Sequence, residues 1–408
     1  MLVTLIPLFD ENMEVRAYSI FTQKRNYLLN PSLLSTALYD DAASISGLDL
    51  IDSMGIETLS ADNTVFVEIN SISIFTDIEN QCSAPRQRLV LLADHTIVPE
   101  EMYINRIKQL RKMGYQMAIR KLPIEKFAEY HEILALMDYI LLDYKKINIA
   151  NAKPFFDKMY PNIKICVVDI GSQEDFDKLK KIGKFDLYEG AFFRVPVAEA
   201  QTEVSPLKTN YIELLNIVND VDFDLSEAAD VVGRDTALVI SLLKMVNHMS
   251  RNSEITSIRH AAAMLGQKEL KKWINTAVTN ELCSDRPSEI TRLSLLRAKF
   301  AENLAPLYEM AGQSSELFLM GLFSVLDVIL DKPMEEALKM VKVSKEIEHA
   351  LVDHTGEMAP ILDFVLQYEM ANWQEVSRLM VLKNIDMNDV YEAYTDSLKW
   401  YRELFHQS

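Results

Sequence analysis

The sequence has little glycine and little cysteine, and both shortages argue against common kinds of site. It contains 11 glycines in 408 residues, well below the usual share of about 7%, and neither GxGxxG nor GxxxxGK[ST] occurs. A glycine-rich loop that cradles phosphate is therefore not expected. The three cysteines, Cys82, Cys166 and Cys283, are widely separated and include no CxxC pair. This spacing argues against a zinc site or a disulfide framework and is typical of free thiols in a reducing cytoplasm.

The sequence also lacks a surplus of basic residues and long apolar runs. Its net charge is −18, and Lys+Arg minus Asp+Glu gives 22 − 28 = −6 for residues 1–200 and 20 − 32 = −12 for residues 201–408. Neither half can neutralise many phosphates, so nucleic acid is not an expected partner. No apolar stretch approaches membrane-spanning length, and the short apolar run at residues 1–9 is better explained as a strand than as a signal peptide. We therefore expect a cytoplasmic protein without membrane contact.

Residues 1–196 alternate short β-rich segments with segments of helical periodicity, such as 100–113 and 172–182. Strands separated by helices predict parallel βαβ units, and eight strands over this length predict a compact (β/α) barrel. Only residues 10–14 join the first two strands, which is too short for a crossover, so we expect this pair to be antiparallel. The expected strands are 3–8, 15–21, 64–69, 88–92, 116–119, 139–142, 164–168 and 185–188.

The β pattern disappears after residue 196. Residues 197–207 are interpreted as a linker, and residues 208–408 as an all-helical second domain. One helical pattern covers residues 258–265 and is expected to end at Gly266. Side chains that can cap helix N-termini recur in this domain at Asp224, Asp235, Ser257 and Ser344.

Residues 114–123 read GYQMAIRKLP. This segment resembles the part of bacterial EAL phosphodiesterase domains that reads GYxLALDDFG. In that family the two Asp residues hold a divalent metal over the cyclic dinucleotide c-di-GMP, and the matching residues here are Arg120 and Lys121. Because Mg²⁺ requires hard oxygen ligands, two cationic side chains cannot replace the two carboxylates. The resemblance therefore implies an EAL-type barrel that has lost its metal chemistry.

The resemblance covers nearly the whole first domain, from residues 6–10, which look like the family's QPIFD, to residues 188–196, which look like its QGYFFxxP. Scaffold positions are kept, whereas ligand positions have changed. One ligand position is placed at Ala93, with Asp94 as the alternative, and only Asp143 keeps its family identity. The degenerate pocket positions that the resemblance implies are Ser19, Glu68, Ala93, Arg120, Lys121, Leu141, Asp143, Val168, Gly171 and Glu189.

Residues 208–408 resemble the HDOD domain, a relative of metal-dependent HD hydrolases that lacks their ligands. An active HD enzyme needs adjacent His and Asp on a helix, so that imidazole and carboxylate meet at one metal. None of the seven histidines here is followed by Asp. The place expected for that pair holds Ser324 and Val325 instead. The segments that carry the resemblance are 235–238, 242–247, 258–261, 265–266, 321–323 and 371–373.

Several acids nevertheless follow the expected strands of the barrel, at the end where the active sites of such barrels lie. Carboxylates that converge from several strands could bind a divalent ion and activate water. Against this enzymatic interpretation, Arg120 and Lys121 can neutralise part of the negative charge by ion pairing, so we expect ion pairs rather than a metal site. The acids are Glu68, Asp94, Asp143, Asp169 and Glu189.

The expected function is that of a catalytically inactive EAL-HDOD signalling adaptor in bacterial signal transduction, which acts by protein–protein interaction and is neither an enzyme nor dependent on a cofactor. The resemblance also suggests a homodimer formed through the barrel. An alternative is a receptor that binds c-di-GMP or another anionic nucleotide near Arg120 and Lys121 without cleaving it. A third interpretation is residual metal-dependent phosphodiesterase activity.

Overall fold

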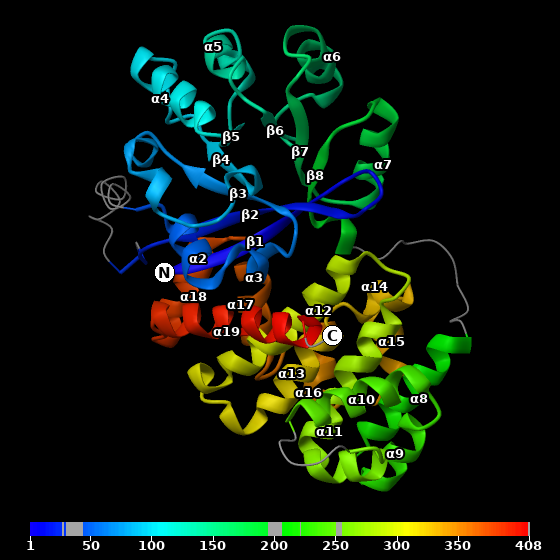
Figure 1. Ribbon diagram of the computed structural model, residues 1–408. Helices are drawn as coiled ribbons and strands as arrows, with labels where there is room; N and C mark the ends of the chain where they lie inside the picture. Colours follow the sequence, from blue (N-terminus) through cyan, green and yellow to red (C-terminus); the bar gives the residue numbers. More distant parts are fainter. Residues whose placement is uncertain (27, 30–43, 195–205, 221, 250–254, 407–408) are drawn as a thin grey trace. The chain divides into compact units, whose positions relative to one another are not determined.

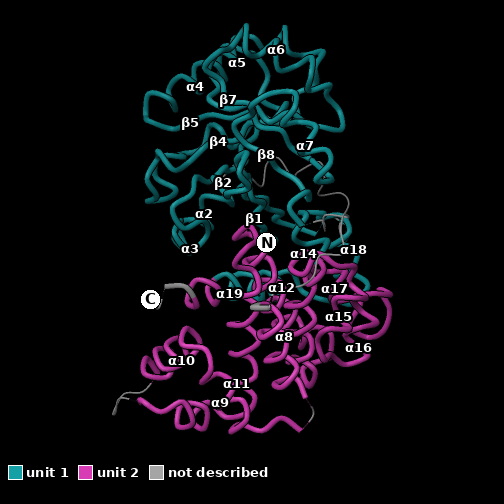
Figure 2. Tube along the Cα trace, turned by 90° about the vertical axis from the view of Figure 1, so that its right-hand side faces the viewer, with its two compact units in different colours: residues 1–195, 366–398 teal, residues 196–365, 399–408 magenta. Residues whose placement is uncertain are grey.

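The chain forms two compact units (Figure 2). In the computed structural model, all residues are described except 27, 30–43, 195–205, 221, 250–254 and 407–408. The barrel unit contains residues 1–195 and 366–398, and the helical unit contains residues 196–365 and 399–408. The compact helical unit thus differs from the expected second domain, 208–408, in that residues 366–398 are grouped with the barrel. The expected linker, 197–207, lies almost entirely outside the described residues.

A closed barrel of eight strands, arranged in sequence order, forms the centre of the barrel unit (Figure 1). Neighbouring strands from β2 to β8 are parallel, whereas β1 is antiparallel to both β2 and β8. The predicted barrel and its antiparallel strand are confirmed, and each strand begins and ends within two residues of its expected position. The strands are β1 (Leu2–Phe9), β2 (Val15–Gln23), β3 (Thr64–Ile69), β4 (Leu89–Ala93), β5 (Gln116–Arg120), β6 (Tyr139–Asp143), β7 (Lys164–Ile170) and β8 (Leu187–Gly190).

Helices α4 to α7 lie outside the barrel and connect its parallel strands (Figure 1). In α4, Ile104, Ile107 and Leu110 recur at helical spacing and are buried, which explains why this segment is helical and which face it turns inward. The helix α7 starts at a side-chain cap, since the Ser172 hydroxyl accepts a hydrogen bond from the Asp175 N–H at 3.2 Å. The helices are α2 (Ser46–Met54), α3 (Ile56–Ser60), α4 (Glu101–Lys112), α5 (His131–Leu134), α6 (Ile149–Met159) and α7 (Gln173–Ile182).

The barrel closes through a short seam between β1 and β8, which pair at Phe9 and Tyr188. Toward its start, β1 keeps β2 on one side and meets the C-terminal segment 366–398 on the other. The Val3 N–H donates to the Tyr368 hydroxyl at 3.2 Å, and the Thr4 and Tyr394 hydroxyls lie 3.4 Å apart. An unpaired strand edge leaves backbone N–H groups without acceptors. Tyr368 satisfies one such donor on an edge that β8 does not reach, while Tyr394 contacts the side chain of Thr4.

Further contacts of segment 366–398 are made at the same end of the barrel, where the parallel strands finish. At the end of β2, the Gln23 amide donates to the Ser377 hydroxyl at 2.9 Å. Beyond β8, Arg194 forms an ion pair with Glu369. The segment joins the barrel unit because it supplies these polar partners and buried rings. It comprises parts of α17 (Ala359–Glu369) and α19 (Met387–His406), and all of α18 (Trp373–Lys383).

From residue 206 onward, every described element is helical, so the predicted all-α class of the second half is confirmed. None of the described helices has both the length and the apolar character that crossing a lipid bilayer requires. The helices of the helical unit are α8 (Pro206–Val218), α9 (Leu225–Val232), α10 (Thr236–Met249), α11 (Ile258–Leu282), α12 (Ser288–Leu304), α13 (Ser314–Phe323), α14 (Leu326–Leu330), α15 (Met334–Lys339), α16 (Lys345–Glu348) and a π-helical turn, His349–Asp353.

The expected side-chain caps are present, but one expected helix end is not. Asp224 accepts a hydrogen bond from the Ser226 N–H at 2.9 Å and starts α9. At Gly266, where we expected a helix to end, φ is +74° and the helix bends, yet α11 continues to residue 282. It resumes because Leu270, Ile274 and Val278 extend a buried apolar stripe at four-residue spacing beyond the bend.

Gly190 provides a test of the barrel's backbone geometry. Its φ is +154°, and a Cβ at this position would lie 2.1 Å from the Ile170 carbonyl oxygen. We expect Gly190→Ala to lower the free energy of unfolding by about 3 kcal/mol, because backbone rather than a flexible side chain would have to move. Gly171→Ala is the matched control, since a Cβ there meets no atom within 4 Å. Urea unfolding measures both variants, and equal stability of the two would contradict the described close approach.

The contact between Tyr368 and β1 provides a second test. Tyr368→Phe keeps the buried ring but removes the acceptor of the Val3 N–H, and a buried unsatisfied donor costs about 1–3 kcal/mol. Tyr160→Phe is the control, because burial raises the pKa of the Tyr160 hydroxyl and no hydrogen-bond partner contributes to that shift. A reduced free energy of urea unfolding is expected only for Tyr368→Phe. Unchanged stability in both variants would mean that segment 366–398 does not satisfy the edge of β1.

Candidate functional site

The candidate site is the end of the barrel interior where the parallel strands finish. A cluster of buried apolar side chains fills the interior and includes Leu141 and Val168, two of the positions that the sequence placed in the degenerate pocket. Side chains alternate between the two faces of a strand, so a residue two positions beyond a cluster member points toward the same interior. Five other candidates occupy such positions, namely Ser19, Glu68, Arg120, Asp143 and Glu189.

Arg120 and Glu189 form the buried centre of this site. The guanidinium Nη2 of Arg120 lies 4.0 Å from a carboxylate oxygen of Glu189, and the two side chains are 12% and 9% exposed. The guanidinium carbon also lies 4.6 Å from the ring centre of Phe21 on β2, within range of a cation–π interaction. The distance to Glu189 is too long for a hydrogen bond. Electrostatic attraction and the aromatic face therefore hold Arg120 in place.

The electrostatics of Glu189 show that several acids face one another here. Burial raises the pKa of the Glu189 carboxyl above its ordinary value, and Arg120 opposes that rise in pKa. Negative charge on Asp169, Glu68 and Asp143 raises the same pKa further. Four of the five acids that the sequence placed at this end, all except Asp94, thus interact electrostatically, and a cation at this point relieves their repulsion.

The other three acids each have a lysine partner. Lys121 lies 4.0 Å from Glu68, Lys146 lies 2.9 Å from Asp143, and Lys145 lies 2.9 Å from Asp169. In every pair at least one side chain is more than half exposed to solvent, so each contributes at most about 1 kcal/mol. The ion pairing that we expected for Arg120 and Lys121 is present, while the parts played by Lys145, Lys146 and Phe21 were not anticipated.

The remaining positions that the sequence assigned to the pocket offer no carboxylate or imidazole to a metal. Ser19 is fully buried, and its hydroxyl makes no hydrogen bond to the described part of the chain. Gly171 follows β7 and has no side chain. Ala93 lies on the face of β4 opposite to the interior residue Leu92, so the alternative, Asp94, has the better position. The Asp94 carboxylate instead accepts hydrogen bonds from Thr96, at 2.8 Å from the backbone N–H and 2.6 Å from the hydroxyl.

Metal-binding geometry is not found at these positions. Within the described residues, no three His, Cys, Asp or Glu side chains are grouped so that they could hold a metal ion. The side chains at the barrel mouth explain this result, since the acids that converge are paired with cations and the other positions that the sequence singled out are small or apolar. Mg²⁺ needs several oxygen ligands in near-octahedral geometry, and this set of side chains does not fit it.

In the helical unit, an arginine contacts one of the two positions, Ser324 and Val325, where the sequence analysis expected the lost His-Asp pair. Ser324 follows α13, and Arg297 of α12 donates to its hydroxyl at 3.0 Å and to its carbonyl at 3.2 Å. Val325 is buried among apolar residues. Gly321 allows α13 to approach this closely, because a Cβ there would lie 2.5 Å from the Arg297 carbonyl oxygen. Neither Ser324 nor Val325 supplies a histidine or carboxylate for a metal.

Comparison with known proteins agrees with the architecture of the second half. Residues 204–361 match the family model of the HDOD domain. The chain carries an HDOD domain. It ends at residue 361 in this match, well before the predicted boundary at 408, and close to where the chain returns to the barrel unit.

The chain is similar in sequence to two curated bacterial proteins. It is 25% identical over 407 residues to the uncharacterized protein YuxH of Bacillus subtilis, covering 98% of this chain and 97% of that protein. It is 26% identical over 329 residues to the cyclic di-GMP phosphodiesterase CdgJ of Vibrio cholerae, covering 78% of this chain and 74% of CdgJ. Among solved structures, a standalone EAL protein from Vibrio cholerae O395 with c-di-GMP bound matches 47% of this chain and 90% of its own, at 15% identity and a TM-score of 0.35.

Removal of Arg120 tests whether it compensates the buried carboxylate. In Arg120→Met, Glu189 keeps its burial but loses its cation, so we expect the free energy of unfolding at about pH 7 to fall by about 3 kcal/mol. The folded-state pKa of Glu189, already raised, should rise further. The deficit should therefore be small below the ordinary pKa of 4.5 and should grow as pH rises through the folded-state pKa.

Two comparisons make this test specific. Arg120→Met combined with Glu189→Gln removes both charges and should recover most of the lost stability. Arg16→Met removes a more exposed cation, paired with Asp10 and Glu14, and should lower the free energy of unfolding much less than Arg120→Met does. Urea unfolding at several pH values measures all variants. A deficit in Arg120→Met that does not change with pH would contradict the pairing.

Proposed function

We propose that this protein is a catalytically inactive adaptor in c-di-GMP-related bacterial signalling, and that it acts by binding protein partners. The observation that carries this proposal is the pairing of each converging acid at the barrel mouth with a cation. Arg120 lies between strands whose acids would otherwise have to share a metal, and Lys121, Lys145 and Lys146 pair with the remaining carboxylates. The HDOD match and the similarity to a cyclic di-GMP phosphodiesterase support the signalling context.

A hydrolysis assay tests the catalytic part of this proposal. With c-di-GMP and either Mg²⁺ or Mn²⁺, we expect product formation no faster than in buffer, because the paired carboxylates do not offer a metal site. Asp143→Ala is the diagnostic variant, since Asp143 retains the family's acidic residue and is paired with Lys146 on the surface. Turnover by the unmodified chain that disappears in Asp143→Ala would sink the adaptor proposal and support residual phosphodiesterase activity.

Capture of a protein partner from lysate tests the binding part of the proposal. A partner captured from lysate by the full chain should be retained in EDTA and by Asp143→Ala, because neither change touches a surface that the adaptor needs. Cross-linking then assigns the contact to the barrel unit or the helical unit. Retention that depends on Mg²⁺ would contradict a metal-independent adaptor. Sedimentation of the purified chain tests the homodimer suggested for the barrel.

A second candidate function is a receptor for an anionic nucleotide that is bound but not cleaved. One observation favours it, since Nε and Nη1 of Arg120 and the hydroxyl of Ser19 are buried and make no hydrogen bond to described residues. Buried donors of this kind usually have a partner. Calorimetry with c-di-GMP in the absence of metal tests the candidate. Binding that is lost in Arg120→Met and weakened in Lys121→Glu would favour a receptor over an adaptor.

A further inference from the structure

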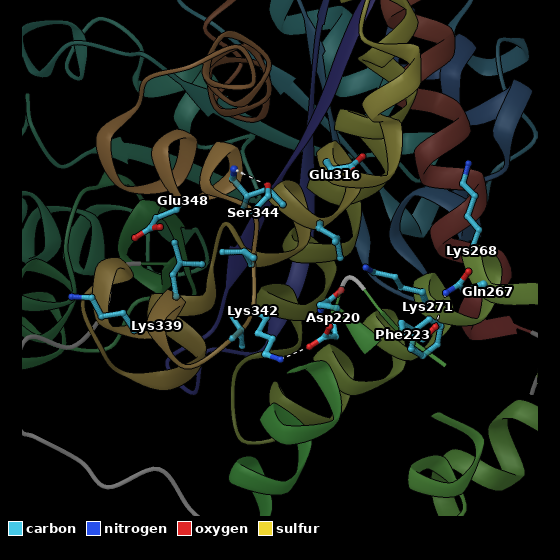
Figure 3. Close-up of a pocket in the computed structure, with 16 residues that line it drawn as sticks. Asp220, Phe223, Gln267, Lys268, Lys271, Glu316, Lys339, Lys342, Ser344 and Glu348 are labelled. Carbon is cyan, nitrogen blue, oxygen red and sulfur yellow. Dashed lines mark hydrogen bonds and ion pairs between the residues drawn. The ribbon is translucent and has the colours of Figure 1, made fainter. Parts of the chain in front are cut away.

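The helical unit contains an open pocket of about 810 Å³ (Figure 3). The helices α11, α13, α15 and α16 contribute to its wall, together with the turn after α8. Its volume lies within the range of about 300–1,000 Å³ that is usual for small-molecule sites. All of its lining residues belong to the helical unit.

The wall of this pocket is partly apolar. Leu319 and Val343 line it with partly exposed apolar side chains, and four buried apolar residues, Phe223, Leu338, Val341 and Ile347, also line it. Local hydrogen bonds fix this part of the wall, since the Gln267 amide donates to the Phe223 carbonyl at 2.7 Å. An apolar surface held in this way can accept an aliphatic or aromatic group without reorganisation.

The charged residues of the pocket give it a net positive charge in an acidic chain. Four lysines and three carboxylates line it, which gives 4 − 3 = +1, whereas the whole chain has a net charge of −18. Two of these lysines are engaged in ion pairs, because Lys342 pairs with Asp220 and Lys339 pairs with Glu335. Lys268 and Lys271 form no ion pair with the described residues.

Of these two lysines, Lys271 is the less exposed to solvent. It projects from α11 toward the side of the pocket where Asp220 and Glu316 lie (Figure 3). Burial lowers the pKa of its amine, and the two acids oppose that change without approaching within ion-pair distance. A half-buried ammonium without an acceptor is poorly solvated, so an anionic group in the pocket would relieve it.

We propose that this pocket binds a small organic anion with an apolar or aromatic body, whose acidic group pairs with Lys271. The acidic group is a carboxylate or a phosphate, and the apolar body packs on the wall near Leu319 and Val343. Lys268, which is exposed and also lines the pocket, adds to the attraction for negative charge. The site is separate from the barrel mouth and does not depend on the adaptor proposal.

Three naphthalene probes test this proposal on the full chain. The first, 2-naphthoate, carries a carboxylate; the second, 2-naphthyl phosphate, carries a phosphate; the third, 2-naphthalenemethanol, is neutral. We expect at least one of the anions to bind saturably and about tenfold more tightly than the alcohol, because a hydrogen bond to a charged group adds that much. The tighter of the two anions identifies the acidic group. Equal binding of the alcohol and both anions, or no saturable binding, would overturn the proposal.

Substitutions at Lys271 locate the bound anion. Lys271→Met keeps most of the apolar stem and should weaken the preferred anion about tenfold, with little effect on the alcohol. Lys271→Arg should retain binding to within about threefold, since the positive charge remains. Lys345→Met is the matched control, because Lys345 is exposed on α16 and does not line the pocket. Anion binding that is unchanged in Lys271→Met would place the ligand elsewhere and overturn the assignment.

The stability of Lys271→Met provides a measurement that needs no ligand. Since this variant removes a partly desolvated ammonium that has no ion pair, its melting temperature should equal or exceed that of the unmodified chain. A marked fall would show that Lys271 is a structural residue and would count against the proposal. The comparison of anions with the alcohol on the unmodified chain then still decides whether the pocket selects negative charge.

Discussion

The site at the barrel mouth depends on one electrostatic constraint, which is that a carboxylate taken out of water must have compensating positive charge. Parallel strands bring their C-terminal ends together, so acids at those ends are forced into mutual repulsion. A bound metal can relieve this repulsion, and so can a cationic side chain. In this chain Arg120 supplies the charge from within, opposite Glu189 and against the face of Phe21. Because Arg remains protonated at any ordinary pH, this compensation is permanent.

Much of the barrel could be predicted from the sequence because its signals are local. Each strand is a short β-rich run between helical or turn segments, and the five residues between β1 and β2 leave room only for a hairpin. The return of segment 366–398 to the barrel could not be predicted. Helical periodicity shows that a face is apolar, but not which surface covers it. The sequence does not show that β1 and β8 pair only briefly, which leaves part of the edge of β1 unpaired. It also does not show that Tyr368, distant along the chain, contacts that edge.

The candidate site shows the same division between local and distant information. Asp143 and Lys146 are three residues apart, so this pair could have been found from spacing alone. Lys145 and Asp169 are joined across neighbouring strands, and only the register of β6 against β7 brings them together. Strand alternation could also have decided between Ala93 and Asp94, since Leu92 faces the barrel interior. The cation–π contact of Phe21 with Arg120 required the strand order of the closed barrel.

The contact between Arg297 and Ser324 in the helical unit is a second observation that supports the adaptor proposal. At its degenerate position, Arg297 binds Ser324 where a metal-dependent relative would need histidine and carboxylate ligands. Burial raises the pKa of the nearby Asp327, while Arg297 lowers that pKa. Both units thus place an arginine where an acidic site could otherwise have formed. Under the proposed function, the exchange of metal ligands for fixed cations would remove the activation of water by a divalent ion and leave the surfaces of the scaffold available to partners. The adaptor proposal therefore rests on two separate features, Arg120 beside Glu189 in the barrel and Arg297 beside Ser324 in the helical unit, which arise in unrelated folds.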